Sequence, residues 1–220
     1  MRWKTTMVLM CAATLVAATP ALRGGWAILT VHELPESLRA GEAVTLTFSM
    51  RQHGEQLMAG RAPVLHVRGD GLLGDRQRVA AERTRQPGVY RATFTAPDAD
   101  KALLRVDTDF HDWNVALYPI PVRSAPEDRG RSLYVAKGCV GCHTKNDDAA
   151  LEDYPQMRVG PDLTGRSYPS AWLVQKITDP ASIAEGRRMT GTVMPQLEVT
   201  AAEAQAIASY LNARSVASRD

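Results

Sequence analysis

Two cysteines and a histidine form the densest group of reactive side chains in this 220-residue sequence. Cys139 and Cys142 are separated by two residues, and His143 follows directly, in the stretch "KGCVGCHTKND". Thiols at this spacing can add to the two vinyl groups on one edge of a haem, and the next imidazole then supplies an axial nitrogen to the iron. The pattern therefore predicts one covalently attached haem c.

Other uses of the two thiols have less support in the sequence. A disulfide between Cys139 and Cys142 would close too short a loop to stabilise the fold much. A thioredoxin-like redox pair would need a βαβ context, which the surrounding residues do not show. A zinc site would need further ligands, and no second cysteine pair exists.

A haem that only transfers electrons needs a ligand opposite His143, and a methionine sulfur suits ferrous iron. Three methionines follow the histidine. Met157 lies too close in sequence to reach the far face, whereas Met189 and Met194 both precede the last predicted helix. The spacing leaves these two open, and the iron ligands expected are His143 and one of them. The remaining histidines lie in the first half of the chain: His32, His53, His66 and His111.

The residues around the motif have a helical pattern. "EDRGRSLYVAKG" places Leu133 and Tyr134 on one side with Gly130, and "PSAWLVQKITDP" predicts a helix that Pro180 ends. Thr200, followed by Glu203, forms a capping box that predicts the start of the last helix.

The first half alternates apolar and polar residues as strands do. Seven segments predict an antiparallel β-sandwich of immunoglobulin-like shape. They are "WAILTVHEL", "EAVTLTFSM", "PVLHVRG", "RQRVAAERT", "GVYRATFTAP", "ALLRVDT" and "NVALYPIPV".

The first residues predict export. A cationic start precedes the apolar run Met7–Ala18, and small residues follow it, with cleavage after Ala18 or Ala21. Cys11 lies inside this run. An uncleaved N-terminal anchor is the alternative, so we expect a protein that is periplasmic or membrane-associated and faces the periplasm.

Charge excludes some partners. The formal net charge is +2, and without Arg2, Lys4 and Arg23 near the N-terminus the rest of the chain would carry −1. Residues 24–123 carry equal numbers of basic and acidic side chains. The sequence thus shows no basic patch for nucleic acid and no steering field that would name a redox partner.

From about Glu127 to Ala213 the chain resembles a class I cytochrome c domain. The matching features, in order, are "GCVGCH", "GPDLTG", the helix around Trp172, "VMPQL" and the terminal helix with Tyr210. The resemblance implies an all-α fold in which the first and last helices cross at Gly130 and Tyr210. It also implies Met194 as the sixth ligand, with Met189 as the reserve. The carbonyl of Pro161 is expected to accept a hydrogen bond from His143 Nδ1.

The segment that begins "LPESLRAGEAVTLTFSMRQHG" resembles, more loosely, the exported YtkA-like sandwich domains. Some exported sandwiches bind copper through histidine and methionine, and His53, Met58 and His66 are the candidates here. The role expected for the sandwich is to dock the cytochrome onto a larger membrane complex or to space it from the membrane.

These observations divide the chain into five parts. The expected parts are a signal peptide or anchor (1–21), a β-sandwich (24–123), a linker (124–129), a cytochrome c domain (127–213) and a tail (214–220). The function expected is single-electron transfer to and from partner proteins, without catalysis of its own, with association to a membrane oxidoreductase complex as one setting. The alternatives are a haem-based ligand sensor with an open sixth position and a copper-handling redox protein.

Overall fold

The computed structural model describes residues 25–71, 74, 76–111, 113–126, 128–183 and 194–217. The predicted signal segment, Cys11 and Met189 lie outside these residues. Within the described part, no helix combines the length and apolar character needed to cross a membrane.

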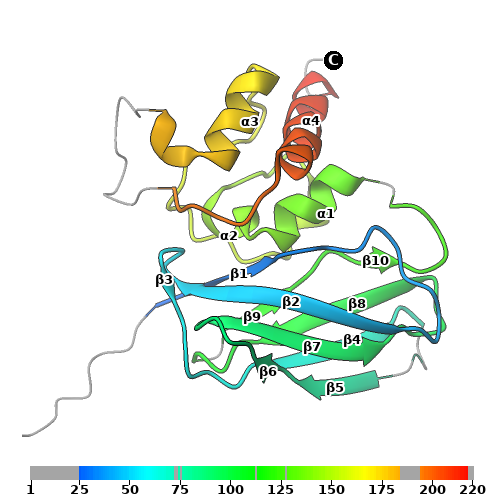
Figure 1. Ribbon diagram of the computed structural model, residues 1–220. Coiled ribbons are helices and arrows are strands. Elements are labelled where there is room, and N and C mark those ends of the chain that lie inside the picture. Colours follow the sequence, from blue (N-terminus) through cyan, green and yellow to red (C-terminus); the bar gives the residue numbers. More distant parts are fainter. Residues whose placement is uncertain are drawn as a thin grey trace, which may run out of the picture.

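Two antiparallel sheets build the first half, as the alternation predicts (Figure 1). The first sheet has the order β1-β2-β7-β6, with β3 on β2. Its strands are β1 (Ala27–Val31), β2 (Ala43–Gln52), β3 (Gln56–Leu57), β6 (Glu82–Arg83) and β7 (Val89–Thr95). The second sheet has the order β10-β8-β4-β5, with β9 on β8. Its strands are β4 (Val64–Gly69), β5 (Arg76–Ala80), β8 (Lys101–Asp107), β9 (Asn114–Ala116) and β10 (Ile120–Pro121).

Every predicted segment contains a strand, but two of them contain two. The segment "RQRVAAERT" divides into β5 in the second sheet and β6 in the first, so the chain changes sheet near Ala81. The segment "NVALYPIPV" divides into β9 and β10. Alternation continues from Val79 to Ala81 across the first break, which is why the pattern alone merged β5 with β6. Across the second break the apolar positions shift phase, from Val115 and Leu117 to Ile120 and Val122. The short strand β3 was not predicted.

Strand β1 differs from the others because all five of its residues are buried. Strands β7 and β8 alternate buried and exposed residues, which is typical of sheets with one solvated face. Burial of β1 on both faces means that a second layer covers it. That layer is the helical half of the chain.

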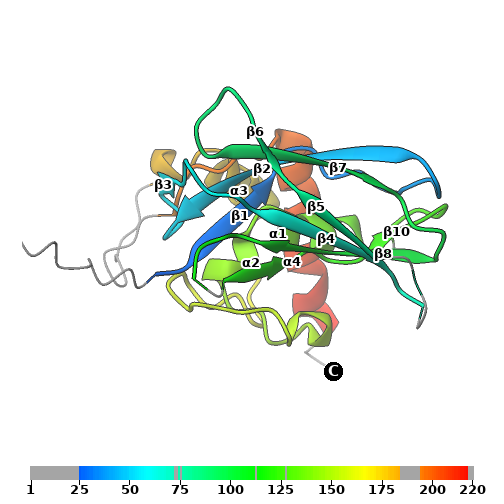
Figure 2. The same cartoon turned by 90° about the horizontal axis from the view of Figure 1, so that it is seen from below.

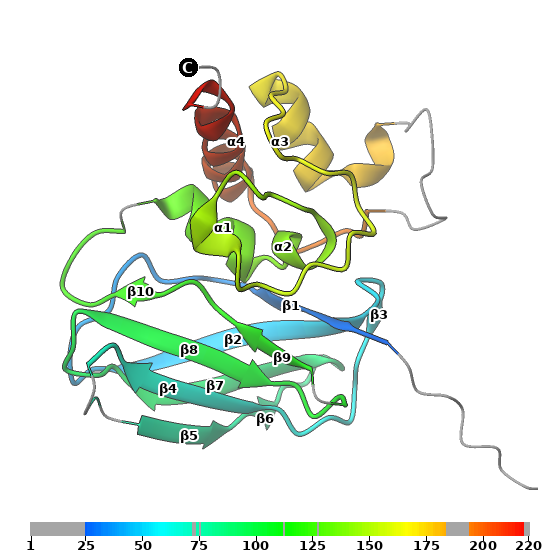
Figure 3. The same cartoon turned by 180° about the vertical axis from the view of Figure 1, so that it is seen from behind.

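The helices all lie on one side of the sandwich, with α1 and α2 next to β1 (Figures 1 and 3). Seen through the sheets from below, α4 lies behind them (Figure 2). The α-helices are α1 (Arg129–Ala136), α2 (Cys139–Cys142), α3 (Ser170–Thr178) and α4 (Ala201–Ala217), and the 3-10 turns are η1 (Ala149–Leu151) and η2 (Pro180–Ser182). Buried apolar residues of the sandwich and of the helices form one continuous cluster.

Local signals set the helix ends. The Asp128 side chain accepts a hydrogen bond from Arg131 N at 3.0 Å and so caps α1. The capping box predicted for the last helix is present: Thr200 N donates to Glu203 Oε2 at 2.9 Å, and Glu203 N donates to Thr200 Oγ1 at 3.3 Å.

Helices α1 and α4 cross where the resemblance implies. A Cβ atom placed on Gly130 would overlap the carbonyl oxygen of Ala206 and the Cβ of Tyr210. The missing side chain therefore lets the two backbones approach directly. This crossing holds the first turn of α1 against the last helix.

Candidate functional site

The segment Gly138–His143 is shaped by one glycine and one short helix. Gly138 has a φ of +83°, and a Cβ there would lie 2.9 Å from Leu29 O in β1. Cys139 and Cys142 then form the ends of the single turn α2, and His143 leaves it in extended conformation. The turn is closed by a hydrogen bond from His143 N to Cys139 O at 3.0 Å.

One cavity receives all five side chains or groups that the sequence predicts for the site. Cys139, Cys142, His143, Pro161 and Met194 all line it. The other walls are mostly apolar and come from α1, α3, α4 and the segment after His143: Tyr134, Val159, Leu163, Tyr168, Trp172, Leu173, Ile177, Ile207 and Leu211. Met157 does not line this cavity, and 37% of its surface is exposed.

The imidazole of His143 is held from one side. Its Nδ1 lies 2.9 Å from the carbonyl oxygen of Pro161, as the resemblance implies. An Nδ1–H that donates to this carbonyl fixes the tautomer with the lone pair on Nε2. A Cβ on Gly160 would lie 2.7 Å from Nδ1 and from Cε1, so the glycine leaves the space that the ring fills.

The two thiols are buried and are not joined by a disulfide. Burial raises the pKa of the Cys139 thiol to about 12 and that of Cys142 to about 11. Reactive redox cysteines and zinc ligands instead need a lowered pKa. Among the described residues, no group of three His, Cys, Asp or Glu side chains could hold a metal ion. The geometry therefore gives no support to a thioredoxin-like redox pair or to a zinc site at Cys139 and Cys142.

Met194 lies in the segment 194–200, which leads into α4 and belongs to no helix or strand. Gln196 Nε2 donates to Thr178 O at 2.7 Å, which fixes the segment to the end of α3. Leu197 is buried, and Met194 is partly buried against the shared apolar cluster. The thioether thus enters the cavity from a different element than the imidazole.

The sandwich covers part of the site, which the sequence did not predict. Trp26 and Ile28 form a buried cluster with Cys142, and Trp113 and Val159 pack against it. The available signal was the run of consecutive apolar residues from Trp26 to Leu29, which is typical of a strand buried on both faces.

The copper candidates are not brought together. Met58 is buried in the sandwich core. His66 lies on β4 between Leu65 and Val67, which face the core, so it points to the opposite face of its sheet. His53 lies in the turn between β2 and β3 of the other sheet. The geometry gives no support to a copper site formed by these three residues.

These donors fit a covalently attached haem. Two thiols one helical turn apart, an imidazole held through Nδ1, a thioether and apolar walls are the groups that such a cofactor requires. Cys139 and Cys142 are placed to hold it, and His143 and Met194 are the candidate axial ligands.

Comparison with known proteins finds a family match for the C-terminal part of the chain. Residues 127–215 match the family model described as Cytochrome c. A search among curated proteins found no matching relative.

Solved structures give only weak likeness. A variant of the superoxide reductase (neelaredoxin) from Ignicoccus hospitalis is 18% identical, with 46% of this chain and 84% of that chain covered and a TM-score of 0.33. A conjugative transposon lipoprotein from Bacteroides eggerthii is 13% identical, with 43% and 95% covered and a TM-score of 0.27. TM-scores this low do not support an assignment of fold or function. The family match and the observed fold identify the two parts of the chain. The C-terminal part of this chain is a helical cytochrome c domain, and it follows an N-terminal region of two antiparallel β-sheets.

Proposed function

We propose that this protein is an exported c-type cytochrome that carries single electrons through one covalently attached haem. The observation that carries the proposal is the meeting of Cys139, Cys142, His143 and Met194 at one apolar cavity. When bound, the haem supplies the Fe(III)/Fe(II) couple. The protein is then an electron carrier and has no catalytic reaction of its own, although it can serve as a subunit of an oxidoreductase complex.

The chain's own residues have distinct roles in this proposal. The two cysteines would tether the cofactor, and the Pro161 carbonyl, which holds the His143 ring through Nδ1, would leave Nε2 available to bind the iron. Met194 would supply a thioether ligand, which would raise the reduction potential relative to a second histidine. The apolar walls exclude water and so limit the reorganisation that accompanies electron transfer.

The test is the absorption spectrum of the exported protein, oxidised and reduced. We expect a six-coordinate low-spin reduced spectrum and, in the oxidised form, a sulfur-to-iron charge-transfer band. This band should vanish in Met194→Ala and persist in Met157→Ala, because Met157 is exposed and does not line the cavity. A wild-type protein that is high-spin, or that binds carbon monoxide readily, would contradict the carrier function and favour a ligand sensor.

Export belongs to the same proposal. The apolar run that ends at Ala18 supports transfer across a membrane before haem attachment. Mass spectrometry of the exported protein should show a new N-terminus after Ala18 or Ala21. A mature protein that retains Met1 would indicate the anchored form instead.

A further inference from the structure

The segment that carries Met194 is held by the β-sandwich as well as by the cytochrome c domain. From the contacts below, we infer that Arg51 of β2 is a positioning residue: through Glu198 it fixes the Met194 segment and thereby favours methionine as the sixth ligand. This inference rests on the proposed function, in which Met194 binds iron.

The first contact is a bidentate ion pair between Arg51 of the sandwich and Glu198 of the cytochrome c domain. Arg51 Nη2 lies 2.6 Å from Glu198 Oε1, and Arg51 Nη1 lies 3.2 Å from Glu198 Oε2. Ser49, on the same face of β2, accepts from Arg51 Nη1 at 2.7 Å and donates to Glu198 Oε2 at 3.3 Å. The Arg51 side chain is 9% exposed and the Glu198 side chain 37%. A bidentate pair of this kind, with its arginine buried, fixes direction as well as distance.

The second contact holds the main chain of the same residue. Lys137 is fully buried, and its Nζ donates to Glu198 O at 2.9 Å and to His32 O at 2.7 Å. It also pairs with Glu203 Oε1 at 2.9 Å. Because Lys137 lies two residues before Cys139, it joins the haem-attachment segment, the sandwich and the start of α4. Glu198 is therefore held through both its carboxylate and its carbonyl.

The third contact lies next to Met194 itself. A Cβ placed on Gly54, in the turn after β2, would lie 3.3 Å from Cγ of Pro195. The sandwich backbone is thus in close approach to the residue that follows the ligand. Arg51 and Gly54 are three residues apart in sequence and hold the segment at Glu198 and Pro195.

These contacts have a consequence for the sixth coordination position. An external ligand binds only to the fraction of molecules in which Met194 has left the iron, so its apparent affinity is proportional to that fraction. Loss of the Arg51 contact removes a restraint on the segment and raises the fraction. The sandwich therefore serves to keep the sixth position closed.

The experiment is a titration of the oxidised, full-length holoprotein with imidazole, followed by absorbance. Arg51→Gln should bind imidazole about tenfold more tightly than wild type, because Met194 should be off the iron in a larger fraction of the molecules. Arg51→Lys retains the charge and should recover part of the difference. Arg91→Gln is the matched control, since it removes an exposed ion pair with Glu82 in the same sandwich (3.0 Å).

Two further measurements keep the result interpretable. The double variant Arg51→Met/Glu198→Gln leaves no buried unpaired charge, so it should fold even if Arg51→Gln does not, and it should also bind imidazole more tightly. An unchanged affinity in both variants, or an equal rise in Arg91→Gln, would overturn the inference. The proposed function fails separately, because its failure shows as a missing charge-transfer band in the wild-type protein.

Discussion

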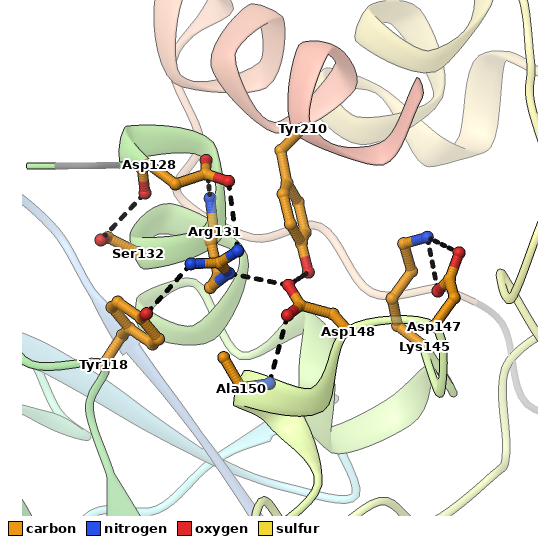
Figure 4. A network of polar contacts seen from close by, with 9 residues as sticks. All are labelled: Tyr118, Asp128, Arg131, Ser132, Lys145, Asp147, Asp148, Ala150 and Tyr210. Carbon is orange, nitrogen blue, oxygen red and sulfur yellow. Dashed lines mark hydrogen bonds and ion pairs between the residues drawn. The ribbon is translucent and has the colours of Figure 1, made fainter. Parts of the chain in front are cut away.

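Arg131 and Asp148 form a buried ion pair that connects helix α1 to the loop after the Cys-x-x-Cys-His motif (Figure 4). Arg131 Nε lies 2.7 Å from Asp148 Oδ2, and the same oxygen accepts from the Tyr210 hydroxyl at 2.7 Å. Arg131 Nη1 also donates to the hydroxyl of Tyr118, in the sandwich, at 3.0 Å. One carboxylate thus joins three elements of the cytochrome c domain, and its arginine reaches the sandwich.

Replacing one member of this pair should destabilise the protein strongly. Arg131→Met leaves the Asp148 carboxylate buried without its cation, and we expect a loss of about 3 kcal/mol in the free energy of unfolding. The double variant Arg131→Met/Asp148→Asn should lose less, since no unpaired charge remains. Denaturant unfolding of the holoproteins measures both.

An exposed ion pair provides the comparison. Arg39 Nη1 lies 3.7 Å from Glu42 Oε1, and most of both side chains is exposed to solvent. Arg39→Met should therefore change the free energy of unfolding little. If Arg131→Met were as harmless as Arg39→Met, the buried network would have no structural importance.

The helix crossing leads to a second prediction, for Gly130. In an open helix, Gly→Ala stabilises because alanine loses less backbone entropy on folding. At Gly130 the new Cβ would overlap Ala206 O and Tyr210 Cβ, and such overpacking costs roughly 1–3 kcal/mol. We therefore expect Gly130→Ala to lower the thermal unfolding midpoint. A raised midpoint would show that α1 and α4 can separate at little cost.

A third prediction concerns the ring of His143. Alanine at Gly160 would place Cβ 2.7 Å from two ring atoms, so the imidazole must shift away from Pro161. We expect Gly160→Ala to give less holoprotein with a low-spin spectrum. The control is Gly141→Ala, whose Cβ would meet Ile28 Cγ1 at an ordinary 3.7 Å. Equal spectra for the two variants would mean that the ring is not confined by residue 160.

The two cysteines and the histidine of the cavity were predictable from local spacing, whereas Pro161 and Met194 were implied by the resemblance to class I cytochrome c domains. Cys139, Cys142 and His143 lie within one turn, and Thr200 and Glu203 cap the helix that follows Met194. Signals of this kind depend on residues a few positions apart. They do not depend on how distant parts of the chain pack.

The contacts between the two halves were not predictable for the opposite reason. Arg51 and Glu198 are separated by 147 positions, and a single buried arginine in an alternating strand has no periodic signature. The exchange of sheets between β5 and β6 was missed because alternation continues through Ala81. Only the apolar residues of β1 indicated that a second layer covers this strand, and they do not indicate which part of the chain forms that layer.

The last prediction is the pH dependence of the Arg51–Glu198 contact. Burial raises the pKa of the Glu198 carboxyl, but the hydrogen bond and charge of Arg51 outweigh it and hold this pKa below the ordinary 4.5. A depressed pKa in the folded state stabilises the protein above pH 4.5, and this contribution is lost as pH falls through the folded value. Wild type should therefore be more stable than Glu198→Gln at pH 7, and the difference should shrink below pH 4.5.

Other charged groups near Glu198 do not change the sign of this effect. His32 faces it from the sandwich, and burial lowers the pKa of His32, so protonation of this histidine destabilises the fold below its ordinary pKa of 6.5. The Glu198 carboxylate raises the pKa of His32, so this loss is larger in Glu198→Gln, and the gap between the two proteins widens as His32 takes up a proton before it shrinks below pH 4.5. Lys137 contacts the carbonyl of residue 198, which both proteins retain. Denaturant unfolding from pH 7 to pH 3 measures the difference, and a constant gap across that range would mean that the carboxylate does not stabilise the interface.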